Sequence, residues 1–327
     1  MRTIKLKYTD YYDGFDPREH VLVKLLEKHY KIEWSDDPDY LIYGVFGDDN
    51  IRYNDCVKIF YTGEDLCPDF NLCDYGIGYE WMDYGDRYFR MPITYNTIYR
   101  DNCLRLERRS ELIPEDAAHR KFCSFVYSNG DADPIREGFF DYLSSNYKQV
   151  DSGGRYRNNV GTPCEDKLEF QKQYKFSLAF ENTSHPGYTT EKLTDSFAAC
   201  TIPIYWGDPE IDKVYNKDSF IIIKSEDDFE KALEVIRGLD NDDKMYIDML
   251  ERDALSDKSY GYEARCSAAE AFLVNVIEQP KELAYRRNRI YWGKMYQQKQ
   301  EAYVKALDFK KKYINPVKGV LNKITGK

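Results

Sequence analysis

The sequence predicts an α/β fold built from two domains with parallel sheets, and three observations support this prediction. Short apolar runs, which are typical of buried strands, alternate with helical stretches through the first 280 residues. The length of 327 residues suffices for two domains, and 42% of the residues are hydrophobic, which is enough for two cores. Residues 174–207 read as one complete strand–helix–strand unit. We therefore expect two Rossmann-like domains.

The first predicted domain covers residues 1–116. Its strand at 40–46 is almost wholly apolar, as expected for a parallel strand that is buried on both faces. Pro17 suits the first position of the helix that follows the first strand. The polar break at 113–116 (Ile-Pro-Glu-Asp) marks the boundary. The expected strands are 4–8, 31–34, 40–46, 57–61 and 75–79, with helices near 17–26 and 101–112.

The second predicted domain covers residues 117–280. A helix from Ile135 presents Phe139, Phe140 and Leu143 to the core, and amphipathic helices dominate after residue 228. The expected strands are 120–127, 147–150, 176–180, 202–206 and 220–223. One expected helix begins at 135, and the others cover 164–174, 190–200, 228–239, 244–255 and 262–277.

Polar residues of the 174–207 unit gather where ligands bind in open α/β sheets. Glu181 and Asn182 follow a buried strand, and Thr189 or Thr190 can cap the next helix. A helix N-terminus offers N–H groups and partial positive charge to an anion, and Lys192 adds a full charge in the first turn. The carboxylate, amide and aromatic groups nearby suit sugar hydroxyls. This chemistry predicts a site for a phosphate attached to a sugar.

Three segments carry a family resemblance: Phe180-Glu181-Asn182, Gly187-Tyr188-x-Thr190-Glu191-Lys192, and residues 202–207 (Ile-Pro-Ile-Tyr-Trp-Gly). Together they resemble the donor-binding signature of the α-1,3/4-fucosyltransferases, glycosyltransferase family 10. The resemblance implies a GT-B architecture, in which two Rossmann-like domains face each other across a cleft. It implies an N-terminal domain that binds the acceptor and a C-terminal domain that binds GDP-fucose.

The resemblance also implies the donor residues. Asn182 would fix fucose hydroxyls, Tyr188 would close the pocket, Glu191 would stabilise positive charge at the fucose ring, and Lys192 would bind the diphosphate. Arg136 matches the phosphate-binding arginine of the family by its Pro-Ile-Arg context, and it lies in the first turn of a helix, where an acidic residue is usual. The other interpretation of Arg136 is an ordinary surface arginine.

Glu64 is the candidate catalytic base. It follows a strand end and a glycine, and Phe-Tyr-Thr-Gly-Glu at 60–64 resembles the segment that carries the proposed base in bacterial members of the family. A solvated loop acid beside Asp65 is the other interpretation. The aromatic and charged segment 79–92 is a candidate acceptor groove or an aromatic packing loop. Glu80 and Asp83 within it are secondary acid candidates.

Asp131 and Asp133 form an Asp-x-Asp triplet, which in another glycosyltransferase architecture binds Mn²⁺ or Mg²⁺. If Arg136 and Lys192 neutralise the diphosphate, no ion is required for that task. We expect no metal site and no required cofactor, and stimulation by Mn²⁺ or Mg²⁺ stays open. A metal-dependent transferase that uses another nucleotide-sugar, and a non-catalytic sugar-binding relative, are the alternatives.

The resemblance therefore implies an enzyme that transfers L-fucose from GDP-fucose with inversion. The acceptor hydroxyl would be O3 or O4 of N-acetylglucosamine or glucose in a surface glycan such as N-acetyllactosamine, as in Lewis antigens. The catalytic residues would be Glu64 and Glu191.

Residues 281–327 form a predicted basic, amphipathic helical tail. They hold 13 Lys/Arg and 3 Asp/Glu, whereas the whole chain has a net charge of −10. Basic residues with interfacial aromatics predict peripheral contact with anionic lipid; packing on the acidic body is the alternative. No nucleic-acid fold signal accompanies the basic tail. Eight cysteines without a paired motif, and no signal sequence, predict a cytoplasmic protein, which the tail would hold peripherally at the inner face of the membrane.

Overall fold

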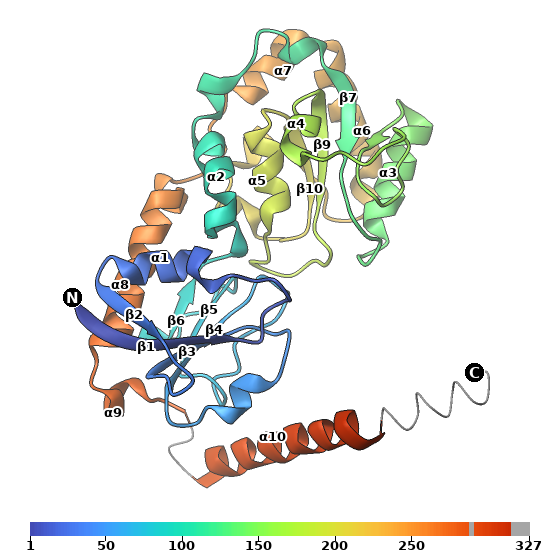
Figure 1. The fold of residues 1–327 in the computed structure, drawn as a ribbon. Helices are drawn as coiled ribbons and strands as arrows, with labels where there is room; N and C mark the ends of the chain where they lie inside the picture. Colours follow the sequence, from blue (N-terminus) through green and yellow to red (C-terminus); the bar gives the residue numbers. More distant parts are fainter. Residues whose placement is uncertain (288–290, 315–327) are drawn as a thin grey trace. The chain divides into compact units, whose positions relative to one another are not determined.

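The chain forms two compact units in the computed structural model, which describes residues 1–287 and 291–314 (Figure 1). Unit 1 comprises 1–78, 83–89 and the described residues from 270 onward, and unit 2 comprises 79–82 and 90–269. Each unit has its own sheet, and each is described by itself below. The domain boundaries at residues 116 and 280 remain predictions.

Unit 1 contains a six-stranded sheet in the order β2-β1-β3-β4-β5-β6. The pairs β1–β2, β1–β3, β3–β4 and β4–β5 are parallel. The middle strands β3 and β4 are buried along their whole length, which explains their predominantly apolar sequence, although β4 includes the buried Lys58. The strands are β1 (Arg2–Thr9), β2 (Tyr30–Trp34), β3 (Tyr40–Tyr43), β4 (Val57–Tyr61), β5 (Tyr75–Gly78) and β6 (Tyr88–Arg90), whose last residue belongs to unit 2.

The helices of unit 1 come from both ends of the chain. Helix α1 (Val21–Glu27) follows β1, and α8 (Tyr262–Glu278) begins in unit 2 and ends in unit 1. After α9 (Lys281–Ala284), the buried Arg287 forms an ion pair with the buried Asp74 and donates to the carbonyls of Asn54 and Cys56. The predicted tail therefore starts with residues that belong to the core of unit 1.

The rest of the described tail is α10 (Tyr291–Phe309), followed by a π-helical turn, Lys310–Ile314. Side chains of α10 contact other parts of unit 1: Arg52 Nη2 donates to Asp308 Oδ2 at 2.6 Å, Asn54 Nδ2 donates to Glu301 Oε1 at 2.9 Å, and Tyr296 Oη donates to Asp69 Oδ2 at 2.8 Å. No helix among residues 1–287 and 291–314 combines the length and apolar character that a bilayer span needs.

Unit 2 contains a five-stranded parallel sheet in the order β11-β10-β9-β7-β8. The strands are β7 (Lys121–Phe125), β8 (Asp151–Ser152), β9 (Tyr174–Phe180), β10 (Ile202–Trp206) and β11 (Ile221–Ile222). The helices are α2 (Arg100–Glu107), α3 (Ile135–Asn146), α4 (Lys167–Gln171), α5 (Glu191–Ala198), α6 (Phe229–Asn241) and α7 (Asp243–Leu250), with short 3-10 turns between elements.

The period of two along the strands divides the core of unit 2 between the two faces of its sheet. Ile202, Ile204 and Trp206 of β10 pack with residues of α3, α6 and α7, whereas Tyr205 packs with residues of α2 and α5. Helices thus cover both faces, as expected for a doubly wound sheet.

The strand order of unit 2 creates a topological switch point between β7 and β9. From β7 the chain passes through α3 to β8 on one side, then through α4 to β9 on the other. Ligands in open α/β sheets bind outside the carboxyl ends of the strands at such a point. The same reasoning places a switch point between β1 and β3 in unit 1.

The two parallel sheets with their helices confirm the predicted α/β fold class. Several predicted bounds were wrong. The strand expected at 147–150 lies instead at Asp151–Ser152, and the helix expected over 164–174 is only α4. Strand β6 was missed because a strand of three residues, part of an aromatic and charged loop, carries no clear period.

Candidate functional site

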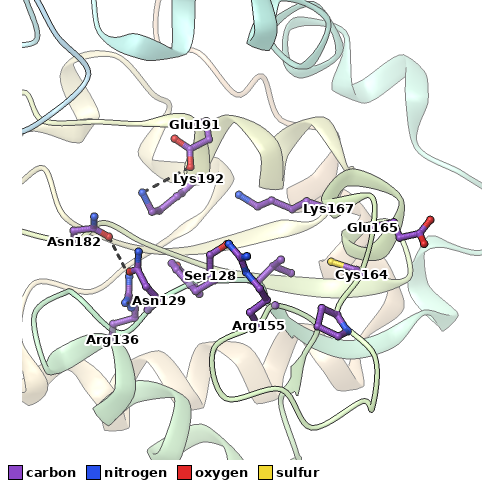
Figure 2. Close-up of a pocket in the computed structure, with 14 residues that line it drawn as sticks. Ser128, Asn129, Arg136, Arg155, Cys164, Glu165, Lys167, Asn182, Glu191 and Lys192 are labelled. Carbon is purple, nitrogen blue, oxygen red and sulfur yellow. Dashed lines mark hydrogen bonds and ion pairs between the residues drawn. The ribbon is translucent and has the colours of Figure 1, made fainter. Parts of the chain in front are cut away.

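A pocket of about 500 Å³ opens at the switch point of unit 2 (Figure 2). Its wall comes from the segment after β7, from Asn182 after β9, and from the first residues of α5. The volume lies within the usual range for small-molecule sites. The lining residues are Val126, Tyr127, Ser128, Asn129, Arg136, Gly154, Arg155, Pro163, Cys164, Glu165, Lys167, Asn182, Glu191 and Lys192.

Arg136 is a buried cation, with 1% of its surface exposed. Nη1 donates to Asn182 Oδ1 at 3.1 Å and Nη2 donates to the carbonyl of Asn129 at 3.0 Å. The guanidinium lies 4.3 Å from the centre of the Tyr127 ring. Among the described residues no carboxylate pairs with Arg136, and its buried Nε has no partner. Because a buried charge without a counter-ion is costly, this geometry favours an anionic ligand.

Glu181 organises the start of α5 from a fully buried position at the end of β9. Its Oε1 accepts from the backbone N–H of Thr190 at 2.7 Å, and its Oε2 accepts from Thr190 Oγ1 at 2.6 Å and from Lys192 Nζ at 3.1 Å. Thr190 is the N-cap residue, but its hydroxyl binds Glu181 instead of a helix N–H. The predicted threonine cap is therefore correct in position and wrong in its bonding.

Opposite charges set the ionisation of Lys192. Burial by itself lowers the pKa of Lys192, but the carboxylates of Glu181 and Glu191 outweigh burial and raise it well above its ordinary value. Lys192 Nζ lies 3.8 Å from Glu191 Oε1. The amine is therefore charged at every physiological pH.

Glu191 and Lys167 also line the pocket. Burial raises the pKa of Glu191, but the charges of Lys192 and Lys167 outweigh burial and lower it, so Glu191 is ionised near neutral pH. Lys167 Nζ binds Asp195 Oδ2 at 2.8 Å. Figure 2 shows Lys167, Lys192, Arg136 and Asn182 around one space. Three cations in one pocket can hold two phosphate groups of a nucleotide.

The loop between β9 and α5 is fixed by a buried carboxylate. Asp208 accepts from the backbone N–H of Gly187 and of Glu210, both at 2.8 Å. Gly187 has φ +88°, and a Cβ there would lie 2.5 Å from the carbonyl oxygen of Tyr79. Tyr188 is buried, and its ring lies 5.0 Å from that of Tyr79. Tyr188 does not line the pocket, so its role at the donor stays a prediction.

Glu64 lies in unit 1, on the exposed loop after β4, where its backbone N–H donates to Thr62 Oγ1 at 3.1 Å. Its role as the base stays a prediction. Of the secondary acids, Glu80 lies 3.3 Å from His185 Nε2, and Asp83 accepts from the backbone N–H of Gly85.

Asp131 and Asp133 are both exposed. Asp133 Oδ1 accepts from the backbone N–H of Ile135 at 3.0 Å, so one of its oxygens is engaged at the start of α3. Within the described residues, no three His, Cys, Asp or Glu side chains gather as a metal site would require.

Four residues predicted from the sequence line the pocket: Arg136, Asn182, Glu191 and Lys192. Glu181, Tyr127 and Lys167 were not predicted to have a role. A charged residue directly after an apolar strand was a usable signal for Glu181. No local pattern marks Lys167, because its approach to Asp195 depends on how α4 packs on α5.

Comparisons with known proteins agree on one family. The model of the α-(1,3)-fucosyltransferase N-terminal domain matches residues 6–99, and the model of the C-terminal region of glycosyltransferase family 10 (fucosyltransferase) matches residues 117–263. An α-(1,3)-fucosyltransferase of Helicobacter pylori is 36% identical over 284 residues, which cover 75% of this chain and 59% of the relative. The chain thus spans about three fifths of that relative's length.

Solved structures give the same result. A crystal structure of an α1,3-fucosyltransferase matches with a TM-score of 0.75 and 30% identity, covering 89% of this chain and 93% of that one. A crystal structure of an α1,3-fucosyltransferase with GDP-fucose matches with a TM-score of 0.74 and 29% identity, covering 88% and 94%. The predicted GT-B fold class is thereby confirmed.

Proposed function

Because the chain belongs to glycosyltransferase family 10, the fucosyltransferases, we propose that it transfers L-fucose from GDP-fucose to a hydroxyl of an oligosaccharide. The observation that carries this proposal is the pocket of unit 2, where the buried Arg136 lacks a carboxylate partner among the described residues and lies with Lys192 and Lys167. The solved relative with GDP-fucose supports the choice of donor.

The charged residues of the pocket match the charges that develop during the reaction. As the bond between fucose C1 and the diphosphate oxygen breaks, its electron pair leaves with GDP, whose added negative charge Arg136 and Lys192 stabilise. Positive charge grows at C1 and on the ring oxygen, near the ionised Glu191. Asn182 hydrogen-bonds the fucose hydroxyls. Since Arg136 and Lys192 supply positive charge at the diphosphate, we propose that no metal cofactor is required.

The acceptor supplies the oxygen for the new bond and releases a proton. The acceptor hydroxyl oxygen forms the new bond to C1 from the face opposite the diphosphate, which inverts the configuration. Its proton passes to the carboxylate of Glu64, which acts as general base. We propose O3, with O4 as the alternative, of N-acetylglucosamine or glucose in a glycan such as N-acetyllactosamine, the precursor of Lewis antigens.

The experiment that tests this function is GDP release in the presence of a chelator. The donors are GDP-fucose, GDP-mannose and UDP-sugars, and the acceptors are N-acetyllactosamine and lactose. We expect release from GDP-fucose alone, and only with acceptor. Release from another donor, or only after Mn²⁺ is added, would favour the metal-dependent alternative at Asp131 and Asp133. Sugar binding without turnover of any donor would favour the non-catalytic relative.

We also propose that the tail contacts anionic membrane from the cytoplasmic side. Tyr291, Trp292 and Phe309 on α10 are 68%, 71% and 58% exposed, beside exposed lysines. Interfacial aromatics with basic residues are typical of peripheral membrane helices.

All eight cysteines lie in the described chain and none forms a disulfide, which supports a reducing compartment.

A further inference from the structure

Two aromatic side chains stand exposed together on unit 1. Tyr12 is 54% exposed and Phe46 is 53% exposed. Their ring centres lie 6.0 Å apart with perpendicular planes. We name this pair the Tyr12–Phe46 platform. Water-exposed aromatic surface that is already paired marks a binding surface more often than a lone exposed residue does.

The platform lies at the switch point of the sheet of unit 1. Tyr12 follows β1 and Phe46 follows β3, and these neighbouring strands are parallel, so their carboxyl ends meet at one edge. Strand β2 pairs with the other side of β1. This edge corresponds topologically to the edge of unit 2 that carries the pocket described above. A ligand of unit 1 is therefore expected there.

The two loops that carry the platform are held together by Asp10. Its backbone has φ +61°, a strained conformation for a residue other than glycine. Its carboxylate accepts from the backbone N–H groups of Asp49 and Asn50 and from Asn50 Nδ2, all at 2.8 Å. A Cβ at Gly44 or Gly47 would lie 2.6 Å from an oxygen of Asp10. The loops are thus pre-organised around a strained residue, as functional sites often are.

The surroundings of the platform are polar. Asp13, next to Tyr12, and Asp48, close to Phe46, are exposed. The Tyr12 hydroxyl has no hydrogen-bond partner among the described residues. Aromatic faces with carboxylates and a hydroxyl at their edge match a sugar ring, which has apolar C–H faces and hydroxyls around its rim.

The proposed base belongs to the same edge. Glu64 follows β4, which pairs in parallel with β3. The Tyr11 hydroxyl donates to the carbonyl of Tyr61, the last residue of β4, at 3.1 Å. We propose that the Tyr12–Phe46 platform binds a sugar ring of the oligosaccharide acceptor, at the strand edge that also carries Glu64. This inference deepens the proposed function and rests on it for the identity of the ligand as acceptor.

Binding of the acceptor without donor tests the platform separately from catalysis. Saturation-transfer NMR on the full chain, with N-acetyllactosamine and lactose as probes, is expected to show transfer to the sugar with wild type. We expect Tyr12→Ala and Phe46→Ala to reduce the transfer strongly and to raise the KM for acceptor at least about 10-fold. The KM for GDP-fucose should stay unchanged. Tyr12→Phe and Phe46→Tyr should retain most binding.

Leu283→Ala is the matched control. Leu283 is 58% exposed and follows α8, whose last residues contact the first residues of β1 and β3, at the opposite edge of the sheet. Thermal melting checks that each variant is folded.

Equal transfer in Tyr12→Ala, Phe46→Ala and wild type, or no transfer to either sugar with wild type, would overturn the platform. The platform would also be overturned if Tyr12→Ala and Phe46→Ala changed only the sedimentation of the protein and not the transfer to sugar, because this result would indicate that the platform serves self-association. Transfer that depends on the platform, without turnover of GDP-fucose, would overturn the proposed function and leave the platform standing as a sugar site.

Discussion

At the scale of single residues, the start of α5 depends on the charge of Glu181. This carboxylate is fully buried, and it binds both Thr190 and Lys192. It is a positioning residue, because it acts on the diphosphate through Lys192 and through the start of α5. Gln at this position would preserve the shape and remove the charge.

We expect Glu181→Gln to lower kcat/KM for GDP-fucose about 10-fold, a loss of about 1.4 kcal/mol in transition-state stabilisation. Burial lowers the pKa of Lys192 and the carboxylates raise it, so loss of one carboxylate must lower it. The alkaline limb of the rate profile should therefore move to lower pH. Thr190→Val is the control: it removes the hydroxyl that donates to Glu181 and accepts from Lys192 Nζ, but it keeps the carboxylate charge, so its alkaline limb should stay closer to wild type than that of Glu181→Gln. An unmoved limb in Glu181→Gln would contradict the assignment.

Glu64→Gln tests the general base. We expect kcat to fall by about 10²–10⁴-fold, because general-base catalysis contributes that factor. Binding of GDP-fucose, measured by calorimetry, should stay at the wild-type value. Asp65→Asn changes the neighbouring acid and should leave kcat close to wild type. Near-full activity of Glu64→Gln would remove this residue from the mechanism.

At the scale of elements, the backbone conformation of the loop between β9 and α5 requires a glycine at position 187. The positive φ and the distance of 2.5 Å from a Cβ to the Tyr79 carbonyl leave no room for a side chain. The loop carries Tyr188 and Thr190, so a shift here would displace the start of α5.

Gly187→Ala is expected to lower the free energy of unfolding by about 1–3 kcal/mol and to raise the KM for GDP-fucose. Gly238→Ala is the matched control. A Cβ at Gly238, inside α6, would meet only Met245 at 3.9 Å, and we expect about 0.5–1 kcal/mol of stabilisation. Urea unfolding measures both. Equal stability of the two variants would contradict the constraint at Gly187.

Helix α1 begins at a buried histidine. His20 Nδ1 accepts from the backbone N–H of Leu22 at 3.3 Å and caps the helix. Burial lowers the pKa of His20 to about 3. Because the unfolded chain protonates this imidazole near pH 6.5, the unfolded state binds more protons below that pH. The stability contributed by neutral His20 is therefore present above pH 6.5 and lost as pH falls toward 3.

His20→Asn keeps a capping side chain but does not titrate in this range. The difference in unfolding free energy between wild type and this variant should change by up to about 1.4 kcal/mol per pH unit between pH 6 and 4. Carboxylates titrate in both proteins and cancel in the difference. A difference that does not vary with pH would show that His20 is not held neutral.

At the scale of the whole molecule, the tail combines fixed and exposed parts. Arg287 is buried with Asp74, and α10 contacts other parts of unit 1 through its acidic residues Glu301 and Asp308. Beyond these contacts, Lys310, Lys311 and Lys312 are exposed next to Phe309 and Tyr313. Packing on the body and contact with lipid are therefore compatible for different parts of the tail.

Changing Lys310, Lys311 and Lys312 to Gln should weaken binding to vesicles of mixed phosphatidylcholine and phosphatidylserine by about two orders of magnitude, at about 1 kcal/mol for each charge. The triple change to Arg keeps the charge and should bind like wild type. Activity on soluble acceptors should be unaffected in both. Flotation assays at low and high salt measure the binding. Equal binding of the two variants would exclude the electrostatic contact.

The amino-acid sequence was sufficient to predict the α/β class and most of the elements, because burial on both faces makes strands such as β4 and β9 predominantly apolar. It also indicated Arg136, Asn182, Glu191 and Lys192, because the polar ends of a strand–helix–strand unit are local in the chain. Local patterns do not specify packing between elements. Only the folded chain shows that Glu181 binds Lys192, that Lys167 lies at the pocket paired with Asp195, and that Arg287 belongs to the core of unit 1. It also brought Tyr12 and Phe46, 34 positions apart, into contact, because strand order and not sequence distance sets which loops meet.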